Sequence, residues 1–287
     1  MPTLSKQLPR LSQGVSAISL AVFLGAILVR GIMTPGTTGT TILLVVSSVA
    51  MFLCCWASAG HLLGARAANT FVAIALPLGW FAEEMGARFG WFFGSYHYTD
   101  VLGPVLGSVP VIIPMMWFAL CYVAFILANL MVWQAPVDQP QASTSWWLHT
   151  LVMSLMAAAL VTAYDLGADP YMVFTLKAWI MTKTDGGWFG ETLVGFAGWL
   201  TVAFVIVLLF RLAVRAHPPR PALPALGRHT AVPLVIYGGS MLFQACLGSP
   251  IETRAIALFA MGIPLLAALC GWARWRAPPV AVPAAAA

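Results

Sequence analysis

Charged side chains are what this sequence has least of. Only 8% of its 287 residues are Asp, Glu, Lys or Arg, while 61% are hydrophobic. A water-soluble domain needs roughly 25% charged residues to cover its surface. The surface of a chain with so few charged residues must contact lipid. One membrane-spanning helix takes about 20 mostly apolar residues. The composition therefore predicts an integral membrane protein.

Several signatures of catalysis and binding are also missing. The five histidines form no H-x-x-x-H or H-x-x-H-H pair, which argues against a membrane di-iron hydroxylase. There is no D-D-x-x-D motif, no P-loop and no dinucleotide fingerprint, and no basic patch with interleaved aromatics for nucleic acid. The five cysteines form no C-x-x-C pair, which favours buried free thiols. We expect chemistry carried by carboxylates, tyrosines and water, without a cofactor or a metal.

Long apolar stretches organise the chain. They lie near residues 15–29, 41–64, 68–85, 111–134, 146–164, 192–213, 231–248 and 254–273. We expect an all-α, polytopic transmembrane bundle of about eight spans, with seven as the alternative, and a single integral membrane domain over residues 1–287. No small-residue cleavage site follows the first stretch, so we expect it to be a retained helix and not a signal peptide.

The basic residues predict an orientation. With the amino terminus inside, nine of them fall on the inner side: Lys6, Arg10, Arg66, Arg211, Arg215, Arg220, Arg228, Arg274 and Arg276. Five fall on the outer side: Arg30, Arg88, Lys177, Lys183 and Arg254. Basic residues concentrate on the cytoplasmic side of membrane proteins. We therefore expect a protein of the cytoplasmic (inner) membrane with both termini in the cytoplasm.

The acidic residues gather in two segments, 83–108 and 165–191. Seven of the nine acids lie there: Glu83, Glu84, Asp100, Asp165, Asp169, Asp185 and Glu191. The segments follow the third and the fifth apolar stretch, so two helices separate them. Both segments should therefore emerge on one membrane face, whichever way the chain is oriented.

The first acidic segment begins with two adjacent glutamates at the end of an apolar stretch. Ionisable groups at such a position usually face a cavity or a partner. The alternative to a functional role is a structural ion pair, because Arg88 lies four residues after Glu84 and can reach it on a helix. Such a pair would leave one of the two glutamates without a basic partner. Three glycines follow at every fourth position: Gly86, Gly90 and Gly94. On a helix they would form one smooth stripe for close packing.

The second acidic segment carries Asp165 and Asp169, four residues apart. If the helix continues to Asp169, the two carboxyl groups share a face, and one of them tends to keep a proton. Pro170 disfavours a helical Asp169, so a helix end with Asp in a turn is the alternative. The aromatic residues near both segments suit either an interfacial belt or a pocket wall that stabilises a cation.

The two segments together resemble the membrane carotenoid-biosynthesis proteins. The pattern E-x-x-G-x-x-x-G-x-x-x-G-x-Y-x-Y-T-D-x-L-G-P runs from Glu83 to Pro104, and D-L-G-A-D-P from Asp165 to Pro170 precedes G-W-F-G at residues 187–190. The resemblance covers roughly residues 70 to 205. That family includes carotenoid hydratases of the gamma-carotene 1'-hydroxylase and bisanhydrobacterioruberin hydratase type.

The resemblance implies addition of water to the terminal isopropylidene double bond of an acyclic carotenoid, of lycopene or gamma-carotene type, giving a tertiary alcohol. The substrate would come from the lipid bilayer, and other carotenoid-biosynthesis enzymes are candidate partners. We expect Asp165 or Asp169 as the acid and Glu83 or Glu84 as the base that orients water, with roles that could be exchanged. We expect the substrate to be lined by Trp91, Tyr96, His97, Tyr98, Trp117, Trp188 and Phe189. The alternative is a non-catalytic carotenoid or lipid carrier, or a scaffold for a biosynthetic complex.

Overall fold

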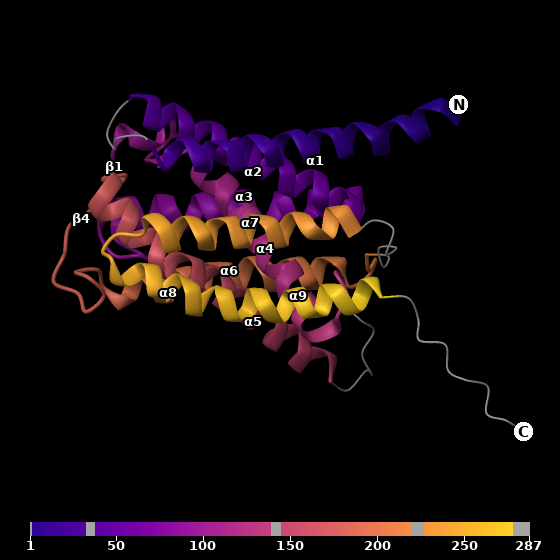
Figure 1. Ribbon diagram of the computed structural model, residues 1–287. Helices are drawn as coiled ribbons and strands as arrows, with labels where there is room; N and C mark the ends of the chain where they lie inside the picture. Colours follow the sequence, from indigo (N-terminus) through magenta and orange to yellow (C-terminus); the bar gives the residue numbers. More distant parts are fainter. Residues whose placement is uncertain (1, 33–37, 139–144, 220–226, 278–287) are drawn as a thin grey trace, which may run out of the picture.

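The protein is a bundle of helices that run side by side (Figure 1). This computed structural model describes residues 2–32, 38–138, 145–219 and 227–277. The helices are α1 (Pro2–Arg30), α2 (Thr38–Leu62), α3 (Ala65–Phe89), α4 (Ile112–Trp133), α5 (Trp146–Pro170), α6 (Leu193–Val214), α7 (Gly227–Leu247), α8 (Glu252–Ala260) and α9 (Gly262–Arg276). Helices α8 and α9 follow one another with only Met261 between them, so they act as one long helix with a break.

Helix α4 is the centre of the bundle. It contacts α2, α3, α5, α6, α7 and α9. In its most apolar 18-residue stretch, 78% of the residues are buried inside the protein. Its sequence is apolar on every side, which is typical of a helix without a solvent or lipid face. Large side chains such as Trp117, Tyr122 and Phe125 are buried along its length.

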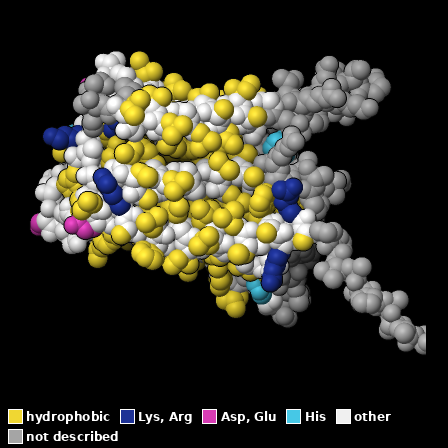
Figure 2. Space-filling view, in the orientation of Figure 1, with side chains coloured by type: hydrophobic (Ala, Val, Ile, Leu, Met, Phe, Trp, Pro, Cys, Tyr) yellow, Lys and Arg dark blue, Asp and Glu magenta, His cyan; other side chains and the backbone are white. Residues whose placement is uncertain are grey.

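Among the described residues, six helical segments are long and apolar enough to cross a membrane. By that measure the chain is a multi-pass membrane protein. The six segments are Thr38–Leu62, Ile112–Trp133, Trp146–Leu176, Leu193–Val214, His229–Leu247 and Glu252–Arg276. Helix α1 adds a shorter apolar stretch, Gly14–Arg30. Figure 2 shows hydrophobic side chains across the middle of the bundle, with Lys and Arg near its two ends. Of the basic residues used to predict the orientation, the side chains of Lys6, Arg10, Arg220 and Arg228 lie outside the described part.

Short strands, which the all-α prediction did not include, close one end of the bundle (Figure 1). They are β1 (Tyr96–Tyr98), β2 (Val105–Leu106), β3 (Val109–Pro110) and β4 (Trp179–Met181), with a 3₁₀ turn η1 (Asp100–Leu102) and a π-helical turn η2 (Tyr171–Leu176). Strand β1 pairs antiparallel with β4, so Tyr96 faces Met181 and Tyr98 faces Trp179. This pairing joins the two acidic segments directly.

The prediction of a helical glycine stripe was wrong. Helix α3 ends at Phe89, and Gly90 caps it in the left-handed region with φ 70°. The Gly90 amide donates to the Gly86 carbonyl at 2.8 Å, and the Trp91 amide donates to the Met85 carbonyl at 3.4 Å. Glycine tolerates this conformation because it has no Cβ, so the chain leaves the helix here.

Helix α5 continues further than the apolar pattern indicated. The last apolar stretch before the second acidic segment ended near residue 164, whereas α5 runs to Pro170 and passes into the π-helical turn η2. Asp169 therefore has helical backbone in spite of the proline after it. A residue before proline disfavours helical backbone for local steric reasons. In this protein, packing within the bundle outweighs that local preference. Asp165 and Asp169 consequently lie on the same face of α5.

Candidate active site

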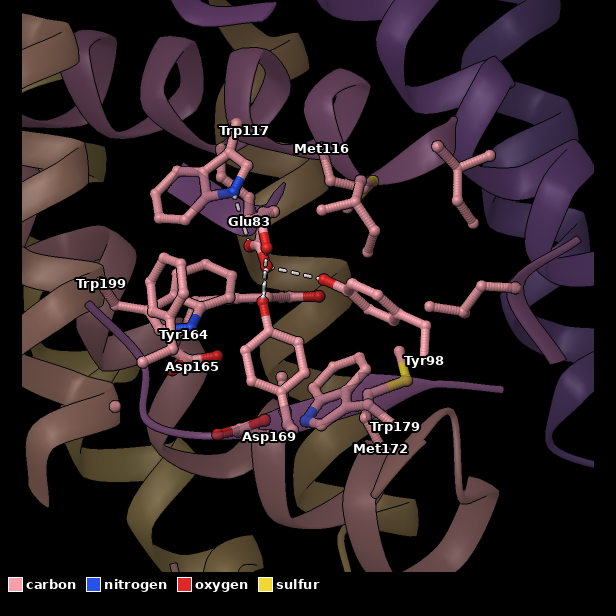
Figure 3. A pocket seen from close by; sticks show the side chains of 18 of the residues that line it. Glu83, Tyr98, Met116, Trp117, Tyr164, Asp165, Asp169, Met172, Trp179 and Trp199 are labelled. Carbon is pink, nitrogen blue, oxygen red and sulfur yellow. Dashed lines mark hydrogen bonds between the residues drawn. The ribbon is translucent and has the colours of Figure 1, made fainter. Parts of the chain in front are cut away.

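A cavity of about 100 Å³ lies at the end of the bundle that carries β1 and β4. Its walls come from α2 to α6 and from the two strands. Seven aromatic residues form much of this wall: Phe93, Tyr96, Tyr98, Trp117, Tyr164, Trp179 and Trp199. Three carboxyl side chains also line the cavity, Glu83 from α3 and Asp165 and Asp169 from α5 (Figure 3). The cavity is therefore a largely apolar chamber with acidic groups on facing helices.

Glu83 is held by three hydrogen-bond donors. Its carboxylate accepts bonds from Tyr96 Oη, from Tyr98 Oη at 2.7 Å and from Trp117 Nε1 at 2.9 Å. The side chain is only 4% exposed, and burying a bare carboxylate is strongly unfavourable. Hydrogen bonds to the charged form offset part of that cost. Glu83 is thus equipped to carry a negative charge inside the cavity.

The two tyrosines that bond to Glu83 stay protonated. Burial, and then the negative charge of Glu83, raise the pKa of Tyr96 and of Tyr98 well above the ordinary tyrosine value. Alternation along β1 explains why both reach the same carboxylate, since side chains two residues apart point to one face of a strand. His97 lies between them and points the other way, where it is exposed. Trp179 and Met181 on β4 face the cavity for the same reason.

Asp165 and Asp169 lie across the cavity from Glu83 (Figure 3). Asp165 is 2% exposed, and its Oδ2 atom has no hydrogen-bond partner among the described residues. Asp169 is 8% exposed, and the Trp179 indole lies close enough to stabilise its charged form. All three carboxyl groups are close enough to act on one another electrostatically. Neither of the two salt bridges within the described residues, Arg88–Glu84 and Arg211–Asp138, reaches this cavity.

A fourth acid, Glu191, stands behind Asp169. It is 1% exposed, and neither of its carboxyl oxygens accepts a hydrogen bond from the described residues. Asp169 lies close enough for a proton on Glu191 to bond to its carboxylate. Burial raises the pKa of Glu191 to about 10, and the hydrogen bond and charge of Asp169 act in the same direction. Glu191 is therefore protonated at neutral pH and can donate to the Asp169 carboxylate.

The loop before α6 fixes the position of Glu191. The Trp188 amide donates to the Glu191 carbonyl at 3.2 Å, and the Glu191 amide donates to the Trp188 carbonyl at 2.9 Å. Gly186 lies against the backbone of Glu191 so closely that a Cβ at this position would clash with it. The G-G-W-F-G sequence therefore folds into a tight turn, and the next residue enters the protein interior.

Comparison with known proteins gives this site a family. The model of the family described as "Carotenoid biosynthesis protein" matches residues 39–268. The chain belongs to the carotenoid biosynthesis protein family. It is also similar to a bisanhydrobacterioruberin hydratase from Haloarcula japonica, with 34% identity over 146 residues, 50% of this chain and 45% of that protein. The chain thus spans less than half the length of this relative. No solved structure matches.

Some of the residues expected to act in this carotenoid biosynthesis protein reach the cavity. Asp165, Asp169, Glu83, Tyr96, Tyr98 and Trp117 line it. The expected ion pair of Glu84 with Arg88 is present at 2.5 Å, and Glu84 also accepts from the Ser108 amide at 2.8 Å. Of the two adjacent glutamates, Glu83 is therefore the one that does not pair with Arg88.

Other expected residues do not line the cavity. Trp91 is 54% exposed and lies outside it. The Trp188 indole donates to the Leu166 carbonyl at 3.1 Å, and Phe189 occupies the tight turn with φ 55°. Together with Glu84 and His97, these side chains surround the site without lining its cavity. Their assignment as functional residues stays a prediction.

Sequence reasoning gave no role to several residues that complete the site of this family member. Glu191 is one of the clustered acids and Phe93 one of the aromatic residues near them, but neither was assigned a role, and Trp179 and Trp199 were not singled out. The short G-W-F-G motif just before Glu191 was the available signal. The described residues hold no cluster of three or more His, Cys, Asp or Glu arranged for a metal ion, and the expected absence of a metal stays a prediction.

Proposed function

We propose that this protein is a carotenoid hydratase that adds water to the terminal isopropylidene double bond of an acyclic carotenoid end. The observation that supports it best is the aromatic cavity with unequal carboxyl groups on facing helices. One of these groups has an unbonded oxygen, and another is surrounded by donors. Acid-catalysed hydration requires a proton donor on one side of an alkene and a basic group on the other.

Asp165 is the acid in this proposal. A buried carboxyl group without donors holds its proton most firmly, because nothing there stabilises the charged form. The Asp165 Oδ2 atom has no partner among the described residues. Asp169, by contrast, has Trp179 and Glu191 at its carboxylate. Asp165 gives its proton to the less substituted carbon of the double bond, which leaves a positive charge on the tertiary carbon.

The aromatic wall stabilises this cation. Trp117 and Trp199 stack with their ring centroids 4.5 Å apart, and Phe93 lies with its ring centroid 6.1 Å from that of Trp117. Aromatic faces attract positive charge, by about 2 kcal/mol or more where water is excluded. Rings are weaker bases and weaker nucleophiles than side chains such as an amine or an imidazole, which would capture the cation more readily. The cation therefore survives until water reaches it.

Glu83 is the base that orients water. Its charged form is held by Tyr96, Tyr98 and Trp117, and it lies across the cavity from Asp165 (Figure 3). The water oxygen bonds to the tertiary carbon, and the released proton passes to Glu83. Transfer of one proton back to Asp165 restores the resting state. The balance is one alkene and one water giving one tertiary alcohol, without an oxidant or a reductant.

The family and the relative favour this reaction over carriage of pigment. The related protein from Haloarcula japonica is named a hydratase, and a carrier has no use for a buried acid with an unbonded oxygen. We further propose eight spans, formed by α1 to α7 and by α8 with α9, in the cytoplasmic membrane with both termini inside. The whole chain then forms one membrane domain, the two acidic segments lie on the opposite face, and the substrate enters sideways from the lipid.

Expression in lycopene-producing cells tests the proposal. We expect a product heavier than lycopene by one water, carrying heavy oxygen when isotope-labelled water is supplied. Asp165→Asn and Glu83→Gln should each lower product formation by about 100- to 10,000-fold, the usual contribution of a general acid or base. Asp185→Asn, an exposed acid in the same segment, is the matched control and should retain activity. Pigment that copurifies unchanged in mass would favour a carrier and overturn the proposal.

A further inference from the structure

A second cavity, of about 110 Å³, adjoins the proposed active site. It lies among α1, α2, α5 and α7, and it meets the first cavity at Met116 of α4. Its walls are about as apolar as those of the first cavity, and its lining among the described residues includes no carboxyl group. Two apolar spaces of similar volume therefore lie next to each other at this end of the bundle.

The two cavities share part of their walls, and this shared wall is the junction between them. Six residues line both cavities: Leu44, Ser48, Met116, Tyr164, Ala168 and Met172. Ser48 and Ala168 have small side chains, whereas Met116 and Met172 are unbranched and flexible. Figure 3 shows both methionines among the side chains that surround the first cavity. Rotation of these side chains can therefore widen the junction without movement of a helix.

The junction lies directly beside the proposed acid. Tyr164, Ala168 and Met172 follow one another at intervals of four residues, so they form a stripe along α5 and η2. Asp165 and Asp169 each come one residue later in the chain and line the first cavity but not the second. A rod-shaped molecule that crosses the junction along this stripe therefore brings its end to the carboxyl groups.

The two strongly polar side chains of the second cavity, Gln244 and Arg30, are held by contacts within the protein. Gln244 Nε2 donates to the Tyr164 carbonyl at 2.9 Å, and Gln244 Oε1 is packed against Gly167. The guanidinium of Arg30 lies over the Tyr171 ring, 5.8 Å from the ring centroid. These contacts hold the polar atoms against the protein, and the remaining space suits an apolar ligand.

We infer that the second cavity binds the polyene chain of the substrate whose end reacts in the first cavity. This inference rests on the proposed hydration of a carotenoid end. An apolar cavity of about 150 Å³ holds a single benzene ring. The first cavity, of about 100 Å³, therefore accommodates the reacting end but not the conjugated chain attached to it. That chain must pass through a wall of the first cavity, and the junction has apolar space behind it.

A substitution on α1 tests this binding directly. Ala26 lines the second cavity but not the first, and it is 6% exposed. Ala26→Phe fills the second cavity, so the carotenoid that copurifies from lycopene-producing cells should fall at least tenfold, and hydration with it. Ala21→Phe adds the same side chain at an exposed position of the same helix and should change neither quantity. Undiminished carotenoid in the Ala26→Phe protein would overturn the inference.

An electron cryomicroscopy map of the unmodified protein with bound lycopene tests the path without any substitution. We expect continuous rod-shaped density from the first cavity, past Ala168 at the junction, into the second cavity. Density that leaves the first cavity through another wall, or a second cavity without density, would overturn the inference whether or not Ala26→Phe folds.

The binding of the polyene and the proposed reaction can fail separately. Carotenoid density in both cavities without any hydrated product would refute the hydration and leave the polyene site intact. Hydration by the unmodified protein, together with an equal rate and equal bound carotenoid in Ala26→Phe, would refute the polyene site and leave the hydration intact.

Discussion

Glu191 offers the sharpest test of how the carboxyl groups of this site depend on one another. Replacement by leucine removes the proton that Glu191 can donate to Asp169 and leaves the Trp179 indole beside that carboxylate. A hydrogen bond to a charged group contributes about 1.5–3 kcal/mol. Since about 1.4 kcal/mol corresponds to a tenfold change in rate, Glu191→Leu should lower hydration by about 10- to 150-fold.

The Glu191→Gln variant tests whether Glu191 acts as a hydrogen-bond donor or as a negative charge. Glu191 is protonated at neutral pH because burial and Asp169 raise its pKa to about 10. The amide of Glu191→Gln is neutral and can donate in the same place, so we expect activity within about threefold of the unmodified protein, a small fraction of the hydrogen-bond energy. Product formed per milligram of folded protein in detergent is the assay. Equal losses in the Gln and Leu variants would refute the shared-proton reading.

The pH dependence of stability gives the same residue a second readout. A carboxyl group whose folded-state pKa is raised stabilises the fold fully below its unfolded pKa, and this contribution is lost as pH rises toward the folded pKa. For Glu191 the window runs from the ordinary value of 4.5 to about 10. Stability should therefore fall across this window by at most about 1.4 kcal/mol per pH unit. Glu191→Gln should flatten that slope, and parallel curves for the two proteins in thermal unfolding would contradict the assignment.

Two further substitutions test the wall of the site and the packing of the bundle. Trp117→Phe keeps a ring in the wall but removes the donor 2.9 Å from Glu83, so hydration should fall about 10- to 150-fold while bound carotenoid, measured by absorbance, is retained. Gly271→Ala would push a Cβ into the Leu130 carbonyl where α9 crosses α4. It should lower the thermal stability by about 1–3 kcal/mol without changing the rate per folded molecule, and an unaltered melting temperature would argue against this close crossing.

The sequence predicted the membrane class and the residues at the centre of the site. Shortage of charge identifies a lipid-facing surface in any conformation, because the need to cover a surface does not depend on the fold. A carboxylate at the end of an apolar helix is unfavourable unless it faces a cavity or a partner. This argument indicated Glu83 or Glu84 and Asp165 or Asp169 as functional residues. Helix counting also predicted that the two acidic segments emerge on one membrane face, and the β1–β4 pairing brings them into contact.

The tertiary structure alone decided between neighbours in the chain. Glu83 and Glu84 are adjacent and both buried, yet one faces the aromatic cavity and the other pairs with Arg88. The rotation of α3 against α4 fixes this choice, and no local pattern records that rotation. Likewise, the strand that turns Tyr96 and Tyr98 inward and His97 outward exists only because a distant segment pairs with it.

Glu191 shows the same limit over a longer distance. Its place behind Asp169 requires the glycine-rich turn before α6 and also the continuation of α5 through Pro170, and the second of these goes against local preference. Burial and the nearness of another carboxyl group are properties of the packed molecule, and they are what change the proton affinity of an acid. The sequence therefore determined which chemical groups this membrane protein carries, and packing decided which of them share a cavity and a proton.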